Sequence, residues 1–205
     1  AATPWWDGAV IYQLIPRSFS DANGDGIGDL KGLQNRLSYL RWLGVDAIWL
    51  TPIYPSPLRD GGYDITDFTD VHPELGDLEG LHRLIHTAHE QGIRVIVDLV
   101  LNHTSTQHPW FQRARFAPQG SADRNFYVWS DHQNGYSEAP VLFQHFERPN
   151  WHWDSQARQF YLHRFLHHQP DLNYDNPAVQ EAMLQVVQFW LDRGVDGFRL
   201  DAIPF

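Results

Sequence analysis

The chain contains no cysteine among its 205 residues, which excludes disulfide bonds, thiolate chemistry and zinc sites built on cysteine. The same absence leaves the redox compartment open, because a protein without cysteine folds on either side of a membrane. Basic residues are also scarce, since 15 Lys and Arg face 25 Asp and Glu and give a formal charge of −10. This balance builds no positive field, so we expect neither nucleic acid nor a membrane as a partner.

Long apolar runs are missing as well. The longest, Ile93 to Leu101, is interrupted by Arg94 and Asp98 and falls far short of the roughly 20 residues that span a bilayer. The chain opens with Ala1-Ala2-Thr3-Pro4 and shows no signal-peptide pattern, which indicates a processed start. We therefore expect a soluble, cytoplasmic protein, and the sequence leaves homo-oligomerisation open.

One sequence pattern occurs three times: an amphipathic stretch, a Gly, a β-branched residue, a polar residue and a short apolar run. The copies are Tyr39 to Leu50, His89 to Val100 and Trp190 to Asp201. Their glycines, Gly44, Gly92 and Gly194, fit the left-handed residue that ends a helix. The apolar runs that follow are typical of strands buried on both faces of a parallel sheet. Alternating helices and strands predict a β/α fold.

Four strands are expected, at Val10–Ser18, Ala47–Pro52, Arg94–Val100 and Gly197–Asp201. A closed (β/α)8 barrel needs eight strands and about 250 residues. The pattern therefore fits either the first half of such a barrel or an open sheet.

The spacing of the three glycines indicates an insertion, because the second interval is roughly twice the first. The segment 104–168 lacks the repeated pattern and is rich in aromatic residues. We interpret it as an inserted subdomain, with 1–103 as the first part of the barrel and 169–205 as its continuation through the fourth strand. The alternative is a long loop, although unstructured loops of this length are uncommon in compact domains.

Oxygen-bearing residues alternate in an acidic segment near the N-terminus. The expected ligands are Asp21, Asn23, Asp25, Asp29 and the backbone carbonyl of Ile27. Such a set suits a hard cation, Ca²⁺ or Mg²⁺, in a stabilising role. The match to an EF-hand is incomplete, because a strand is expected before the loop and Gly32 stands where the final Glu would be. The alternative is a solvated acidic turn, and no organic cofactor is expected.

Polar residues cluster where the third and fourth strands end: Asp98, Asn102, His103, Arg199 and Asp201. A charged Arg199–Asp201 pair within an apolar strand would cost several kcal/mol if it were buried without partners. It is either a structural ion pair at the rim or part of a site. Two further carboxylates, Asp64 and Asp98, favour a site in which Arg199 keeps the acids ionised.

Several of these segments resemble the α-amylase superfamily of retaining α-glucoside enzymes. The motifs are Gly62–Ile65, Asp98–His103, Gln169–Asn173 and Gly197–Asp201. The resemblance covers the whole chain and implies an α/β fold, a (β/α)8 TIM barrel of which the first four units are present. His163–Phe165, Gln169–Pro177 and Asp201–Phe205 look most like the trehalose synthase branch, whose members isomerise maltose to trehalose.

The resemblance also implies roles for single residues. Asp201 would be the nucleophile that forms a covalent glucosyl-enzyme, with Arg199 keeping it ionised and Asp98 orienting Arg199. Asn102 and Asp171 would bind a second Ca²⁺.

Four further residues would contact the substrate. Asp64 and His103 would hydrogen-bond hydroxyls of the reacting glucose, and Tyr63 would stack beneath its ring. Gln169 would be a further contact.

Retaining chemistry uses two carboxyl groups about 5 to 5.5 Å apart. The resemblance places the acid/base Glu beyond Phe205, so we expect the 205-residue chain alone to be inactive. In the complete protein we expect maltose, trehalose and glucose as ligands, with the aromatic insert helping to exclude water from the intermediate. The alternatives are an α-glucosidase or transglucosidase that acts on short α-glucosides, and a non-catalytic sugar-binding fragment.

Overall fold

The computed structural model describes residues 3–147 and 149–204. The chain divides into two compact units, each with its own buried core. Unit 1 comprises Ala1–Pro55, Thr69–Leu99 and Val187–Leu200, and unit 2 comprises Ser56–Phe68, Val100–Val186 and Asp201–Phe205.

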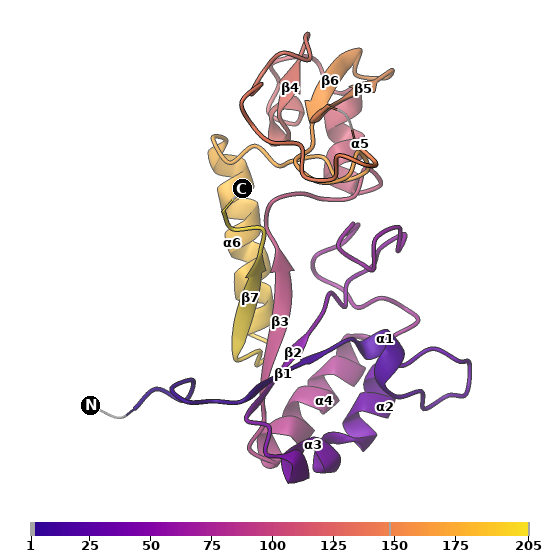
Figure 1. Ribbon diagram of the computed structural model, residues 1–205, viewed down its shortest axis with the longest axis vertical. Helices are drawn as coiled ribbons and strands as arrows, with labels where there is room; N and C mark the ends of the chain where they lie inside the picture. The colour runs from indigo at the N-terminus through magenta and orange to yellow at the C-terminus, as the bar shows by residue number, and fades with distance from the viewer. Residues whose placement is uncertain (1–2, 148, 205) are drawn as a thin grey trace. The chain divides into compact units, whose positions relative to one another are not determined.

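A four-stranded sheet with the order β1-β2-β3-β7 forms the centre of unit 1 (Figure 1). Its strands are β1 (Ile11–Leu14), β2 (Ala47–Leu50), β3 (Arg94–Val100) and β7 (Gly197–Asp201). The first three run parallel, with Ile11 opposite Ala47 and Ala47 opposite Arg94. The spatial order of the strands follows the chain, as the alternation of helices and strands predicts, and the predicted bounds of β3 and β7 are confirmed.

Short helices connect the strands of unit 1. They are α1 (Pro16–Phe19), α2 (Leu30–Asn35), α3 (Leu37–Leu43) and α4 (Leu78–Glu90). The Asp77 side chain caps α4 by accepting a hydrogen bond from the Gly80 amide at 2.7 Å. One face of α4, including Leu81, Leu84 and Ile85, is buried, and α2 packs against α4 (Figure 1).

The predicted helix ends are confirmed at all three glycines. Gly44, Gly92 and Gly194 have φ values of 87°, 72° and 88°, in the left-handed region where a side chain would be strained. The helix before Gly194, α6 (Pro177–Leu191), begins at Pro177. The Asn176 side chain accepts a hydrogen bond from the Ala178 amide at 3.0 Å, as expected of an N-cap.

The predicted first strand, Val10–Ser18, is too long. β1 ends at Leu14, because Pro16 has no N–H for a strand ladder and instead occupies the first turn of α1. The acidic segment therefore follows a helical turn and not a strand. The second strand is also shorter than predicted, since β2 ends at Leu50.

Unit 2 contains an antiparallel sheet of order β4-β6-β5. Its elements are α5 (Pro109–Phe116), the 3₁₀ turn η1 (Arg124–Phe126), β4 (Trp129–Ser130), β5 (Trp151–Asp154) and β6 (Gln159–Leu162). The Phe111 ring is buried edge-on against Tyr127 and Tyr161, with ring centroids 5.1 and 5.2 Å away. Segment 104–168 therefore has secondary structure and a core, which excludes the long-loop alternative. Its predicted boundaries at 104 and 168 stay a prediction.

Among the described helices, none combines the length and apolarity that crossing a membrane requires.

Candidate active site

A buried aspartate lies near the end of β3, within unit 1. The Asp98 side chain is fully buried, and its two oxygens each lie 3.2 Å from Arg199 Nη1, which donates to them. Trp49 Nε1 donates to Asp98 Oδ2 at 3.1 Å, and the Arg199 guanidinium lies 4.9 Å from the centroid of the Trp49 ring. The buried negative charge thus has a cation and a neutral donor, as buried ion pairs require. Asp98 thus contacts Arg199, and its role in orienting that arginine stays a prediction.

A cavity of about 230 Å³ lies in unit 2. Its lining residues are Asp60, Tyr63, His103, Phe143, Phe165, Leu166, Gln169 and Asp201. Four residues predicted from the sequence therefore meet there: Tyr63, His103, Gln169 and Asp201. Carboxylates, an imidazole and aromatic rings around one small cavity are chemically suited to a sugar, whose hydroxyls need hydrogen bonds and whose ring faces pack on aromatics.

Asp201 reaches this cavity from the end of β7. The next residue, Ala202, has a φ of 55°, which is a strained left-handed conformation for a residue with a side chain. Strain of this kind persists where the surrounding structure enforces it, and it is common at functional sites. The carboxylate of Asp201 acts to raise the pKa of His103, so the two groups interact electrostatically.

His103 is buried, with its ring 5.4 Å from that of Phe165. Burial lowers the pKa of His103 to about 4, although the nearby carboxylates of Asp201 and Asp60 act in the opposite direction. The imidazole is therefore neutral at neutral pH. In that form it can exchange hydrogen bonds with a hydroxyl group without carrying a charge.

Two of the three aspartates in the 56–68 loop, Asp60 and Asp64, lie close together. Asp64 is fully buried and does not line the cavity. Its Oδ1 accepts a hydrogen bond from Ser56 Oγ at 2.7 Å, and its Oδ2 accepts one from the Arg59 amide at 3.2 Å. Asp60 lines the cavity instead. The predicted sugar contact of Asp64 stays a prediction, while Asp60 lies in the cavity wall.

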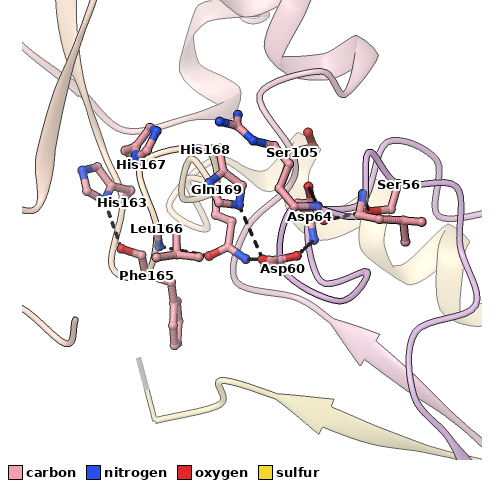
Figure 2. A network of polar contacts seen from close by, with 12 residues as sticks. Ser56, Asp60, Asp64, Ser105, His163, Phe165, Leu166, His167, His168 and Gln169 are labelled. Atoms are coloured by element: carbon pink, nitrogen blue, oxygen red, sulfur yellow. Dashed lines mark hydrogen bonds and ion pairs between the residues drawn. The ribbon is translucent and has the colours of Figure 1, made fainter. Parts of the chain in front are cut away.

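A glycine turn brings these two carboxyl groups together. Gly61 and Gly62 have φ values of 80° and 102°, and the Asp64 amide donates to Asp60 Oδ1 at 3.0 Å (Figure 2). Burial, and then contact with Asp60, raises the pKa of Asp64 to about 6. Burial also acts to raise the pKa of Asp60, but the nearby His168 and Asp64 outweigh it and lower that pKa. Asp64 thus holds its proton more readily than Asp60, which stays ionised at the cavity.

Gln169 is fixed from both ends of its amide group. Its Nε2 donates to Asp60 Oδ2, and its Oε1 accepts from the Leu166 amide at 3.0 Å (Figure 2). The side chain lies in the cavity wall, yet both of its polar atoms have partners within the protein. Its most direct link to a ligand therefore runs through Asp60.

Sequence reasoning missed Asp60 and His168. Asp60 stands four residues before Asp64 in the same loop, and spacing alone does not tell which carboxylate faces a cavity. His168 is one of twelve histidines and belongs to none of the motifs. The only feature that could have identified it is its position directly before Gln169.

The acidic loop is ordered by its own backbone. Asp21 accepts hydrogen bonds from the amides of Asn23, Gly24 and Gly26, which lower the pKa of its carboxyl. Asp29 caps α2 by accepting from the Gly32 amide at 2.6 Å. These are hard oxygen donors of the kind that Ca²⁺ and Mg²⁺ prefer, so the residue types of the loop fit either ion. Binding of an ion by the five predicted ligands stays a prediction.

Asn102 and Asp171, the residues predicted for a second Ca²⁺, are neighbours. Asn102 Nδ2 donates to Asp171 Oδ1 at 3.1 Å, and the Arg164 amide donates to the same oxygen at 3.0 Å. Burial raises the pKa of Asp171 to about 7. Coordination of a cation would require the Asn102 amide to turn its oxygen inward and Asp171 to lose its proton.

Comparison with known proteins agrees with these features. The family model described as "Alpha amylase, catalytic domain" matches residues 13–205. A trehalose synthase/amylase of Mycolicibacterium smegmatis is 58% identical over 203 residues, which are 99% of this chain and 34% of that protein.

Solved structures lead to the same family. The α-glucosyl transfer enzyme XgtA has a TM-score of 0.91 at 50% identity, covering 100% of this chain and 38% of its own. A mutant of MutB in complex with its substrate sucrose has a TM-score of 0.90 at 45% identity, covering 98% and 36%. This chain thus spans about a third of the length of the relatives that it matches. The predicted (β/α)8 fold class is confirmed, with part of the barrel present. The chain belongs to the α-amylase catalytic-domain family.

Proposed function

We propose that the full-length protein transfers α-glucosyl groups with retention of configuration and isomerises maltose to trehalose. The observation that carries the proposal is the unit 2 cavity, where Asp201 meets Asp60, Tyr63 and His103. Similarity to a trehalose synthase over almost the whole chain supports it.

In the proposed reaction, Asp201 attacks the anomeric carbon of maltose. A bond forms between a carboxylate oxygen and that carbon, and the glycosidic bond breaks toward the leaving oxygen. That oxygen takes a proton from a second carboxyl group, which residues outside 1–205 would supply. The released glucose then attacks the same carbon through its anomeric hydroxyl, whose proton passes to the second carboxylate. The bond between that carbon and Asp201 breaks, which frees the Asp201 carboxylate and yields trehalose. Arg199 would keep Asp201 ionised.

Residues of the cavity wall would bind the reacting sugar. We assign the hydroxyl contacts to the ionised Asp60 carboxylate and to the neutral imidazole of His103, and the stacking contact to Tyr63. The backbone amide of Asp64 would help to hold the Asp60 carboxylate in place.

Isomerisation requires that water stay away from the covalent intermediate while glucose turns. Phe143 and Phe165, both from the aromatic insert, lie in the cavity wall and are suited to this exclusion. Trimming the insert in the full-length protein should raise the share of free glucose among the products. An unchanged share would contradict this role.

The acidic loop would hold Ca²⁺, or Mg²⁺, through Asp21, Asn23, Asp25, Asp29 and the Ile27 carbonyl. The ion would tie α1 to α2 and take no part in the reaction. Chelation should therefore lower the melting temperature of the full-length protein, and Ca²⁺ should restore it.

The test is incubation of the full-length protein with maltose, followed by NMR of the products. Trehalose as the main product supports the proposal. Two glucoses per maltose would identify an α-glucosidase, and binding without turnover would identify a sugar-binding module. Residues 1–205 alone should show no turnover, because the second carboxyl group is missing from them.

A further inference from the structure

His168 occupies a tight turn beside the cavity. The Gln169 amide donates to the Leu166 carbonyl at 2.8 Å, and the Thr106 amide donates to the His168 carbonyl at 3.0 Å. The His168 side chain is 8% exposed. The backbone therefore holds this imidazole in one place, inside the protein.

The buried nitrogen of His168 faces the Asp60 carboxylate. Its Nε2 lies 3.7 Å from Asp60 Oδ2 (Figure 2). Among the described residues, this nitrogen has no hydrogen-bond partner at normal distance. A buried polar atom without a partner is costly, and contacts in an empty site often shorten when a ligand binds. Asp60 is the acceptor that the geometry offers.

Asp60, Asp64 and His168 are spaced like metal ligands, since their ligand atoms all lie within 4.8 Å of one another. However, all four carboxylate oxygens already accept hydrogen bonds, from Ser56, the amides of Arg59 and Asp64, and Gln169. A metal ion would compete with these donors. The cluster is therefore better suited to holding a carboxylate in position than to binding an ion.

We propose that His168 is a positioning residue that, together with Gln169 and the Asp64 amide, holds the Asp60 carboxylate against the reacting sugar. The inference rests on the proposed function, in which Asp60 binds sugar hydroxyls. It adds that sugar recognition depends on the His168 imidazole, which contacts the Asp60 carboxylate but does not itself line the cavity.

The experiment compares His168→Leu with His168→Gln in the full-length protein. The leucine has no donor for Asp60, so the KM for maltose should rise about tenfold with kcat within about twofold, because the lost contact acts in ground and transition states alike. The glutamine retains an N–H donor and should keep KM within about threefold of the wild type. His167→Gln is the matched control, because the His167 imidazole contacts Glu147 at 2.8 Å and not Asp60. It should leave KM unchanged.

A double variant separates positioning from a general loss of structure. If His168 acts through Asp60, then His168→Leu should change KM less than about twofold in an Asp60→Asn background. Effects that multiply, or a His168→Leu variant with wild-type KM, would overturn the inference. A wild-type protein without glucosyl transfer would instead overturn the proposed function. Melting curves identify any variant that fails to fold, and the glutamine variant then carries the test: a KM within about threefold of the wild type supports positioning, and a tenfold rise overturns it.

Discussion

Two aspartates, Asp98 in unit 1 and Asp64 in unit 2, are both fully buried, and the protein compensates them differently. Asp98 is matched by the Arg199 guanidinium and by the Trp49 indole N–H. Asp64 has a hydroxyl and an amide as donors, and the neighbouring carboxyl group of Asp60 raises its pKa. Burial alone therefore does not decide the charge of a carboxyl group; its partners do.

The difference bears on function. A carboxylate paired with arginine stays charged and holds that arginine in place. A carboxyl group with a raised pKa can retain a proton and so let its neighbour, Asp60, carry the charge at the cavity.

The largest effect should follow from breaking the first pair. Arg199→Leu leaves the Asp98 carboxylate buried without a cation and should lower the free energy of unfolding by about 3 kcal/mol. Urea unfolding of the full-length protein measures it. Arg83→Leu is the control, because its pair with Glu79 is exposed and should contribute less than about 1 kcal/mol. Equal losses in the two variants would contradict the account.

A smaller, pH-dependent effect should come from Asp64. Its raised folded pKa stabilises the protein below the unfolded value of 3.8, and this stabilisation is lost as pH rises through about 6. Asp64→Asn does not titrate. The melting temperature of the variant minus that of the wild type should therefore be larger at about pH 7.5 than at about pH 4.5. A difference independent of pH would show that Asp64 titrates normally.

The smallest effect should come from Ser56→Ala, which removes the hydroxyl donor to Asp64. We expect a loss of about 1 kcal/mol in the free energy of unfolding. Because that donor stabilises the charged form, its removal should also move the titration of Asp64 to higher pH. Ser18→Ala is the control, since the Ser18 hydroxyl donates to the Ile15 carbonyl at 3.3 Å, far in the sequence from Asp64. It should leave the titration of Asp64 in place.

Much of the fold was predictable because it depends on local rules. Gly44, Gly92 and Gly194 mark helix ends by a conformation that glycine adopts without strain, and the apolar runs after them become strands of the parallel sheet. The end of β1 was predictable in principle, because Pro16 cannot extend a strand ladder. The apolar residues around Pro16 favoured a longer strand, and the predicted end at Ser18 was therefore wrong.

The site was only partly predictable, because cavities form from residues distant in sequence. Motif resemblance identified Tyr63, His103 and Asp201, which do line one cavity. The place of Asp60 in the same cavity was not predictable, because it depends on the turn at Gly61 and Gly62, which changes the direction of the chain between Asp60 and Asp64.

The most direct test is to trap the covalent intermediate. The full-length protein would be incubated with a fluorinated α-glucosyl fluoride that forms a glucosyl-enzyme but hydrolyses slowly, and its peptides would be analysed by mass spectrometry. We predict one added fluoroglucosyl group on the peptide that contains Asp201, and none in the Asp201→Asn variant. Label on a different residue, or turnover that persists in that variant, would contradict the account.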